Sequence, residues 1–212
     1  GIKVTLNDAT NATVTVTGDV NDVIRNVENV RGTAGADIIF GDNAANEFYA
    51  LAGNDTLNGG AGTDYLDGGE DNDLFLGSAG QDFYQGGSGV DTMDFSAQAG
   101  INFISVTLSG SFTAAITIDG EDDDLAANVE NVIGTAGNDS IWGDTEVNIL
   151  QGLGGNDELA GRAGNDTLDG GADIDRVRYY EAAARVIVDL SAGTASDDGD
   201  GGVDTLIGIE DV

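Results

Sequence analysis

Large apolar residues recur every nine residues through two stretches of the chain, 32–94 and 134–178. We number each copy from one to nine, so that 59–67 is one copy, and its eighth position is always large and apolar or aromatic. Its neighbours are smaller or polar. This alternation predicts one very short strand per copy, with one side chain pointing into a core. The position-eight residues are Ile39, Phe48, Leu57, Leu66, Phe75, Tyr84, Met93, Ile141, Leu150, Leu159, Leu168 and Val177.

The other positions of each copy predict a tight turn that offers a carboxylate. Gly occupies position one in eleven of twelve copies and position four in eight. Because Gly accepts positive φ without steric cost, these positions favour a sharp reversal. Position six is Asp in ten copies and Asn in two, Asn46 and Asn148. A fixed period with a constant chemical role at two positions is typical of stacked repeats.

If two successive copies form one coil, copies eighteen residues apart lie on the same side. Stacked coils then bury a continuous ladder of position-eight side chains, which a single short strand cannot do. The same stacking places Asp55 beside Asp73 and Asp64 beside Asp82. Like charges at such close range repel, and an internal cation would remove that cost.

The composition favours calcium as this cation. Calcium takes six to eight oxygen ligands at roughly 2.3–2.6 Å, which carboxylates and turn carbonyls supply. Zinc and copper prefer nitrogen and sulfur ligands, and the chain has no His, no Cys and one Met. Magnesium prefers a rigid octahedron and keeps its waters. The alternative is that Gly and Asp only form turns, but turns alone do not require Asp at the same position of every copy.

The nonapeptide Gly-Gly-x-Gly-x-Asp-x-large apolar-x resembles the RTX, or haemolysin-type, calcium-binding repeat, over about half of the 212 residues. The resemblance implies an all-β fold, with calcium-stabilised parallel β-roll (β-solenoid) blocks joined and capped by short strand or hairpin segments. It also implies that each calcium lies between two turns on the same side. One turn supplies the carbonyls of positions two and four with its Asp, and the other supplies those of positions one and three with its Asp.

Carried onto this chain, the family pattern allows five sites in the first block and three in the second, for up to about eight ions. One site would use Gly60, Gly62 and Asp64 with Gly77, Ala79 and Asp82. The next, on the opposite face, would use Gly69, Asp71 and Asp73 with Gly86, Ser88 and Asp91. The remaining implied ligands are Asp37, Asp55, Asp139, Asp157, Asp166, Asp175, Asn46, Asn148, Gly35, Gly53, Gly137, Gly152, Gly154, Gly155, Gly170 and Ala172.

The second copy of each block departs from the pattern. Ala44 and Glu146 replace the Gly of position four, and Asn46 and Asn148 replace the Asp of position six. A neutral ligand and a non-Gly residue at a positive φ both weaken a site. The pairs Asn46/Asp64 and Asn148/Asp166 are therefore the weakest predicted sites.

Longer repeats frame the nonapeptides. Asn-Val-Glu-Asn-Val stands at 26–30 and 128–132, and a related Gly-Ile-Glu-Asp-Val closes the chain at 208–212. We predict a strand or hairpin cap at 1–31, a roll at 32–94, a connecting strand or hairpin segment at 95–133, a second roll at 134–178, and a strand segment at 179–212 that leads into an expected next block. Within the flanks, alternating stretches at Lys3–Thr17, Ile101–Asp119 and Arg185–Ala195 carry the strand prediction. The start at Gly and the absence of a signal peptide suggest an excerpt or a processed product.

Two other features allow two interpretations each. The acidic runs Glu121–Asp124 and Asp197–Asp200 are either solvated loops, which we favour, or additional calcium ligands without EF-hand spacing. Trp142 with Tyr179 and Tyr180 forms either a ligand platform or, more commonly, core and cap contacts.

The net charge is −32, from 39 acidic and 7 basic side chains. It argues against nucleic-acid partners and anionic membranes, and the uncharged stretch 97–118 is too polar for membrane insertion. It also opposes compaction, so we expect a chain that is unfolded without calcium and folded with it. The family resemblance implies type I secretion and an extracellular, possibly cell-surface, location.

Catalysis is not expected from this chain. Without His and Cys, Ser–His and Cys–His nucleophilic sites are excluded, and calcium accounts for most of the regular carboxylates. The favoured function is a structural or adhesive calcium module of a secreted or surface protein, such as an adhesin, an S-layer or an extracellular filament. The alternative is the calcium-folding secretion domain of an exported protease, lipase or toxin. Head-to-tail self-association, or contact with neighbouring modules of the same protein, is a further expectation.

Overall fold

The computed structural model describes residues 1–7, 12–16, 22–24, 27–98, 100–110 and 114–212. All regular structure among these residues is β, in short strands joined by turns. The chain divides into two compact units. Unit 1 comprises Gly1–Met93 and Asp123–Val129, and unit 2 comprises Asp94–Asp122 and Glu130–Val212.

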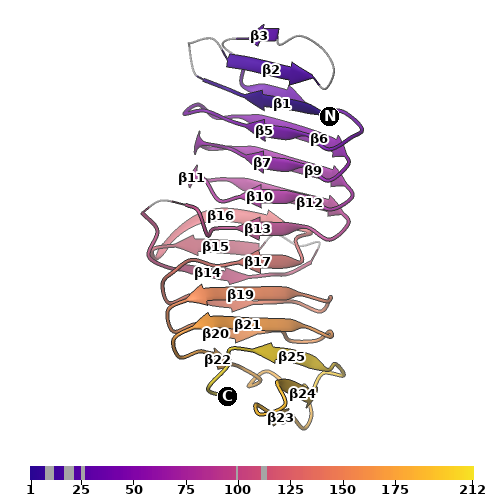
Figure 1. The fold of residues 1–212 in the computed structure, drawn as a ribbon, viewed down its shortest axis with the longest axis vertical. Helices are drawn as coiled ribbons and strands as arrows, with labels where there is room; N and C mark the ends of the chain where they lie inside the picture. Colours follow the sequence, from indigo (N-terminus) through magenta and orange to yellow (C-terminus); the bar gives the residue numbers. More distant parts are fainter. Residues whose placement is uncertain (8–11, 17–21, 25–26, 99, 111–113) are drawn as a thin grey trace. The chain divides into compact units, whose positions relative to one another are not determined.

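Unit 1 has two walls of mostly parallel strands. One wall runs in the order β13-β10-β7-β5-β1-β2-β3 and the other in the order β16-β12-β9-β6-β4. Figure 1 shows β5, β7 and β10 stacked in one wall and β6, β9 and β12 in the other. The strands of the first wall are β1 (Ile2–Thr5), β2 (Ala12–Val16), β3 (Asp22–Ile24), β5 (Ile38–Phe40), β7 (Thr56–Asn58), β10 (Leu74–Leu76) and β13 (Thr92–Asp94). Those of the second are β4 (Asn29–Arg31), β6 (Glu47–Ala52), β9 (Tyr65–Glu70), β12 (Phe83–Ser88) and β16 (Glu121–Ala127).

Unit 2 repeats this arrangement. One wall runs β23-β24-β25-β21-β19-β17 and the other β22-β20-β18-β14-β15. The first wall consists of β17 (Asn131–Ile133), β19 (Ile149–Gly154), β21 (Thr167–Ala172), β23 (Ile187–Asp189), β24 (Thr194–Asp197) and β25 (Asp204–Ile207). The second consists of β14 (Ile104–Thr107), β15 (Ala114–Ile118), β18 (Ser140–Trp142), β20 (Glu158–Ala160) and β22 (Arg176–Val177).

The strand register confirms the predicted eighteen-residue coil. Leu57 aligns with Phe75, Leu66 with Tyr84, and Leu150 with Leu168 in parallel pairs. Every position-eight side chain is fully buried, at 0% exposure. Burying such a side chain contributes roughly 1.5–3 kcal/mol, so the ladder between the walls is the core of each unit.

The flanking segments form the predicted hairpins and extend the walls. β1 pairs antiparallel with β2 and parallel with β5, so that Val4 aligns with Ile39. β14 pairs antiparallel with β15 and β23 with β24. Residues 8–11 and 17 of the first predicted segment lie outside the described residues. Antiparallel hairpins added to a parallel wall cover a strand that would otherwise present an open edge.

Candidate calcium sites in the stacked turns

A ladder of hydrogen bonds joins turns that lie eighteen residues apart. The backbone N–H of position six in one turn donates to the side-chain Oδ1 of position six in the next turn. The bonds join Asp37 to Asp55 (2.6 Å), Asn46 to Asp64 (2.7 Å), Asp55 to Asp73 (2.8 Å), Asp64 to Asp82 (3.0 Å), Asp73 to Asp91 (2.8 Å), Asp139 to Asp157 (2.8 Å), Asn148 to Asp166 (2.9 Å) and Asp157 to Asp175 (2.8 Å). The structure thus brings together all eight pairs of position-six residues that the sequence predicts.

The second carboxylate oxygen of many of these side chains has no hydrogen-bond donor in the described part of the chain. The ten position-six Asp residues are at most 3% exposed. Among the described residues, no hydrogen-bond donor reaches the buried Oδ2 of Asp55, Asp64, Asp73, Asp157, Asp166 and Asp175. A buried charged oxygen without a partner costs several kcal/mol, which a bound cation would offset. Hard carboxylate oxygens beside backbone carbonyls are the donor set that calcium takes, so these residues fit the ion.

Burial also changes the acidity of these side chains. Removal from water, together with neighbouring carboxylates, raises the pKa of Asp64, Asp73, Asp157 and Asp166 to about 7. The pKa of Asp55 rises to about 6 for the same reasons. Hydrogen bonds from the ladder N–H groups act in the opposite direction. The metal-free turns therefore hold carboxylates that resist ionisation near neutral pH.

The backbone of most turns is left-handed at positions two and four. Gly60 and Gly62 have φ of +94° and +123°, and Gly80 has +125°. A Cβ on Gly80 would lie 1.6 Å from the carbonyl oxygen of Gly62, so successive turns stack with no room for a side chain between them. β8 (Ala61–Gly62) and β11 (Ala79–Gly80) pair in parallel at this point. The non-Gly residues that adopt this conformation in the turns are Leu51, Asp71, Leu153, Arg162 and Asp173.

The first two turns of each block have a different geometry, and the expected strain at Ala44 and Glu146 was wrong. Neither residue is among the described residues with positive φ. In these turns the position-two side chain accepts the N–H of position four. Asp42 accepts from Ala44 at 2.9 Å and Asp144 from Glu146 at 2.9 Å, while Thr33 and Thr135 do the same in the first turns. This side-chain bond holds the turn without a left-handed residue.

In the same turns the position-six side chain is engaged locally. Oδ2 of Asp37 accepts the N–H of Thr33 at 2.5 Å, and Oδ2 of Asp139 accepts that of Thr135 at 2.6 Å. The Asn148 amide accepts the N–H of Asp144 and donates to the carbonyl of Glu130. An amide donor therefore stands where other turns carry a carboxylate oxygen. That the Asn pairs bind metal most weakly stays a prediction.

Three further carboxylates join the ladder from outside the nonapeptide blocks. The N–H of Asp82 donates to Asp124, that of Asp166 to Asp204, and that of Asp175 to Glu210, at 2.9, 3.1 and 2.9 Å. The nine-residue period did not predict these three pairings. The available signal was an acid two residues before an apolar residue, as in Asp124/Ala126 and Asp204/Leu206, where Ala126 aligns with Tyr84 and Leu206 with Leu168.

The solvated-loop interpretation of the acidic runs was wrong at two positions, because Asp124 and Asp198 are buried. Across the described residues, no group of three or more His, Cys, Asp or Glu side chains is arranged to hold a metal by itself. Backbone carbonyls must then complete any site, as the turn geometry permits.

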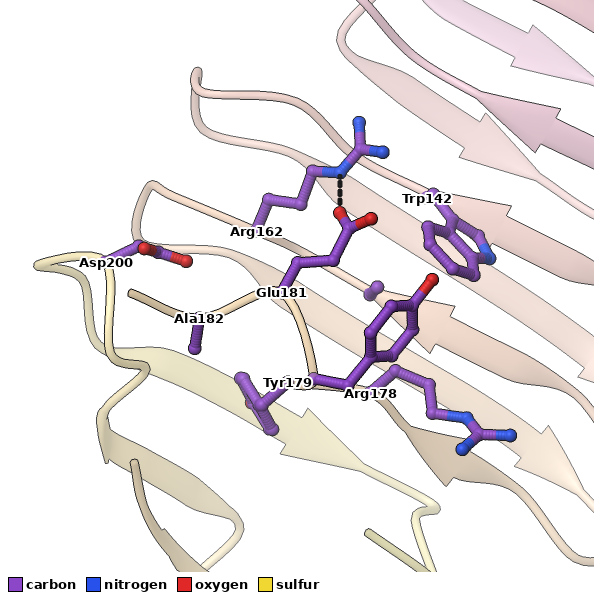
Figure 2. Close-up of a pocket in the computed structure, with 9 residues that line it drawn as sticks. Trp142, Arg162, Arg178, Tyr179, Glu181, Ala182 and Asp200 are labelled. Carbon is purple, nitrogen blue, oxygen red and sulfur yellow. Dashed lines mark hydrogen bonds and ion pairs between the residues drawn. The ribbon is translucent and has the colours of Figure 1, made fainter. Parts of the chain in front are cut away.

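Three aromatic residues of unit 2, Trp142, Tyr179 and Tyr180, line a small pocket (Figure 2). Trp142 and Tyr180 meet edge to face at 5.5 Å, and the Arg162 guanidinium lies over the Trp142 ring, 5.7 Å from its centroid. Tyr179 instead donates its hydroxyl to Asp204 at 2.9 Å. Contacts within the protein thus engage all three aromatic residues, as expected of cap residues.

Repeated burial of paired carboxylates in a parallel β-solenoid defines a calcium-binding repeat module. The family model for the RTX calcium-binding nonapeptide repeat (4 copies) matches residues 27–57, 40–75, 58–93, 127–146 and 142–177. These matches cover more than half of the chain, which belongs to this family. No curated protein compared with the chain matches it. The described residues include no helix long and apolar enough to cross a membrane.

Proposed function

We propose that the protein is a non-catalytic structural module that folds on binding calcium outside the cell. The observation that carries this proposal is the group of buried position-six carboxylate oxygens, such as Oδ2 of Asp64 and Asp73, to which no described residue donates a hydrogen bond. Each is an acceptor that folding takes from water and that the protein itself does not satisfy. A divalent cation between successive turns supplies the missing partner.

The proposed ions lie between turns eighteen residues apart. Asp64 and Asp82 with the turn carbonyls of Gly60, Gly62, Gly77 and Ala79 would hold one ion. On the opposite face, Asp73 and Asp91 with Gly69, Asp71, Gly86 and Ser88 would hold the next. In unit 2, Asp157 and Asp175 belong to the equivalent pair. The left-handed backbone at Gly60, Gly62, Gly69 and Asp71 supports these assignments, since it is shared by the turns that contain unpartnered oxygens.

Calcium would also supply the charge balance that folding requires. The chain carries a net charge of −32, and its acids are brought together in the stacked turns. When a ligand binds only the folded state, its binding free energy stabilises the fold. The same coupling would keep the chain unfolded where calcium is scarce and fold it where calcium is millimolar.

A calcium titration of the chelator-treated chain, followed by far-UV circular dichroism, tests this proposal. We expect a cooperative coil-to-β transition with calcium and a much weaker response to magnesium at the same concentration. Chains that are fully β in chelator, with no response to calcium, would show that the Asp residues are turn formers and not ligands.

The wider role that we propose is structural or adhesive, as part of a secreted or surface protein. The tandem framing of two rolls by similar Glu-centred segments supports it, because such repetition suits an extended load-bearing chain. The alternative is a secretion domain joined to an exported enzyme or toxin. The sequence of the complete gene separates them: further copies of the unit favour the first, and a catalytic domain favours the second.

A further inference from the structure

A segment outside both nonapeptide blocks is built as another copy of the repeat. It reads Gly199-Asp200-Gly201-Gly202-Val203-Asp204-Thr205-Leu206-Ile207, with Gly at one and four, Asp at six and Leu at eight. Residues 179–198 separate it from the block that ends at 178, so the nine-residue period does not reach it. The family match also ends before it, at residue 177.

The segment makes the same backbone contacts as a regular copy, with the turn of Gly161–Asp166. The N–H of Val203 donates to Asn165 Oδ1, as that of Ile174 does to Asn156 one copy earlier. The Asp166 N–H donates to Asp204 Oδ1, and the Thr205 N–H donates to the carbonyl of Asp166. Positions five, six and seven are therefore in the register of the repeat.

The two turns enclose acidic oxygens in the interior of unit 2. Asp166 is 1% exposed, and Asp198 and Asp204 are fully buried at 0%. None of the described residues donates a hydrogen bond to Oδ2 of Asp166. A Cβ on Gly202 would lie 1.5 Å from the carbonyl oxygen of Gly164 and 2.3 Å from Asp198 Oδ2. Because Gly202 has no side chain, the carbonyl oxygen of Gly164 and Oδ2 of Asp198 can both lie close to its Cα.

The intervening residues hold this turn in place. Asp198 accepts the N–H groups of Asp200, Gly201 and Gly202, which shapes the turn and adds a negative charge. Tyr179 donates to Asp204 Oδ2 from the start of the insertion. Glu181 pairs with Arg162, at position two of the facing turn, as Figure 2 shows. Residues 179–198 therefore contact both turns through hydrogen bonds and an ion pair.

We infer that residues 198–204 and the turn of Gly161–Asp166 form an additional calcium site, with Asp166 and Asp204 as carboxylate ligands, carbonyl oxygens such as that of Gly164 beside them, and Asp198 positioning the turn. Two buried carboxylates beside a backbone carbonyl oxygen suit a hard divalent cation. The inference rests on the proposed function, because it assumes that paired Asp residues of stacked turns bind calcium.

Native mass spectrometry of the calcium-loaded chain tests the inference by counting ions. Asp204→Asn keeps an oxygen for the Asp166 N–H but removes the charge, and we expect it to bind one calcium fewer than the unmodified chain. Asp189→Asn is the matched control, since Asp189 is exposed, lies outside both turns and accepts a hydrogen bond from Ser191. An unchanged ion count in Asp204→Asn, beside a calcium-loaded unmodified chain, overturns the inference alone. An unmodified chain without bound calcium overturns the proposed function.

A second pair of variants covers the case in which Asp204→Asn does not fold. Terbium replaces calcium in oxygen sites and emits when a nearby phenol is excited. Tyr179→Phe removes the phenol that contacts Asp204, whereas Tyr180→Phe removes one that packs on Trp142. We expect lower terbium emission from Tyr179→Phe than from Tyr180→Phe at equal saturation. Equal emission from the two variants counts against an ion at Asp204.

Discussion

The backbone N–H of Asp55 donates a 2.8 Å hydrogen bond to Oδ1 of Asp73, whose buried Oδ2 receives no hydrogen bond from the residues that the structure describes. The two carboxylate oxygens of Asp73 therefore have different roles. Through Oδ1 the side chain joins two coils, and through Oδ2 it presents a charged acceptor to the space between turns. The same arrangement recurs in successive turns. Because stacking of the coils also buries the carboxylate charge, the arrangement couples stacking to the binding of a cation.

Asp73→Asn tests the role of the Asp73 charge separately from the role of the hydrogen bond between the coils. The Asn Oδ1 can still accept the Asp55 N–H, so the ladder is retained while the charge is lost. Because Asp73 belongs to two proposed sites, we expect the calcium midpoint of folding to rise roughly tenfold or more, equivalent to about 1.4 kcal/mol. Circular dichroism during calcium titration measures the midpoint. Asp67→Asn, which removes the same charge at position nine, should leave it within about twofold. Equal shifts in both variants would indicate a general charge effect.

Gly80→Ala tests the close stacking of the turns. Gly80 has a φ of +125°, and an added Cβ would lie 1.6 Å from the Gly62 carbonyl oxygen. We expect a loss of at least about 2 kcal/mol in the free energy of unfolding, from backbone strain and displacement of the turn. Gly35→Ala occupies the same repeat position but has no positive φ, and its nearest neighbour is 3.7 Å away. It should cost under about 0.5 kcal/mol by thermal denaturation at saturating calcium. Similar losses would contradict the distinct geometry of the first turns.

The sequence predicted the core and the main ladder because both depend on a strict period. Position eight is buried in every copy, and the position-six residues pair eighteen residues apart, as the alternation and the Gly spacing indicated. The hairpins at the flanks were also predictable from their alternation. These features follow from local pattern, which needs no knowledge of distant contacts.

The remaining features depend on contacts that no fixed spacing reveals. Ala44 escapes strain because the Asp42 side chain caps its N–H, a choice between two turn types with similar sequences. Asp204 rejoins the ladder after an intervening segment, so its partner Asp166 lies 38 residues away and not eighteen. Asp198 is buried by that same return of the chain. The backbone conformation of Ala44 and the burial of Asp198 and Asp204 thus depend on tertiary contacts and not on composition.

Phe75→Ala tests the contribution of the position-eight ladder. Phe75 is fully buried and meets Tyr84 edge to face at 5.7 Å. Truncation should lower the free energy of unfolding by about 3–5 kcal/mol, because it removes buried apolar area and leaves a cavity. Chemical denaturation at saturating calcium measures the loss. Phe103→Ala is the control, since Phe103 is 38% exposed and should cost less than about 1.5 kcal/mol. A small loss at Phe75 would mean that calcium, and not the core, dominates stability.

The buried carboxylates predict an unusual pH dependence for the calcium-free chain. Burial raises the pKa of Asp64, Asp73, Asp157 and Asp166 to about 7 in the folded state, whereas an unfolded Asp titrates near 4. The protonated fold is therefore favoured fully below about pH 4, and this stabilisation is lost as pH rises through about 7. We expect the chelated chain to gain β-structure, seen by circular dichroism, as pH falls from 7.5 to 4.5. Calcium binding should weaken over the same range, because protons compete for the oxygens. A chelated chain that loses β-structure on acidification would contradict the burial of uncompensated carboxylates in the turns.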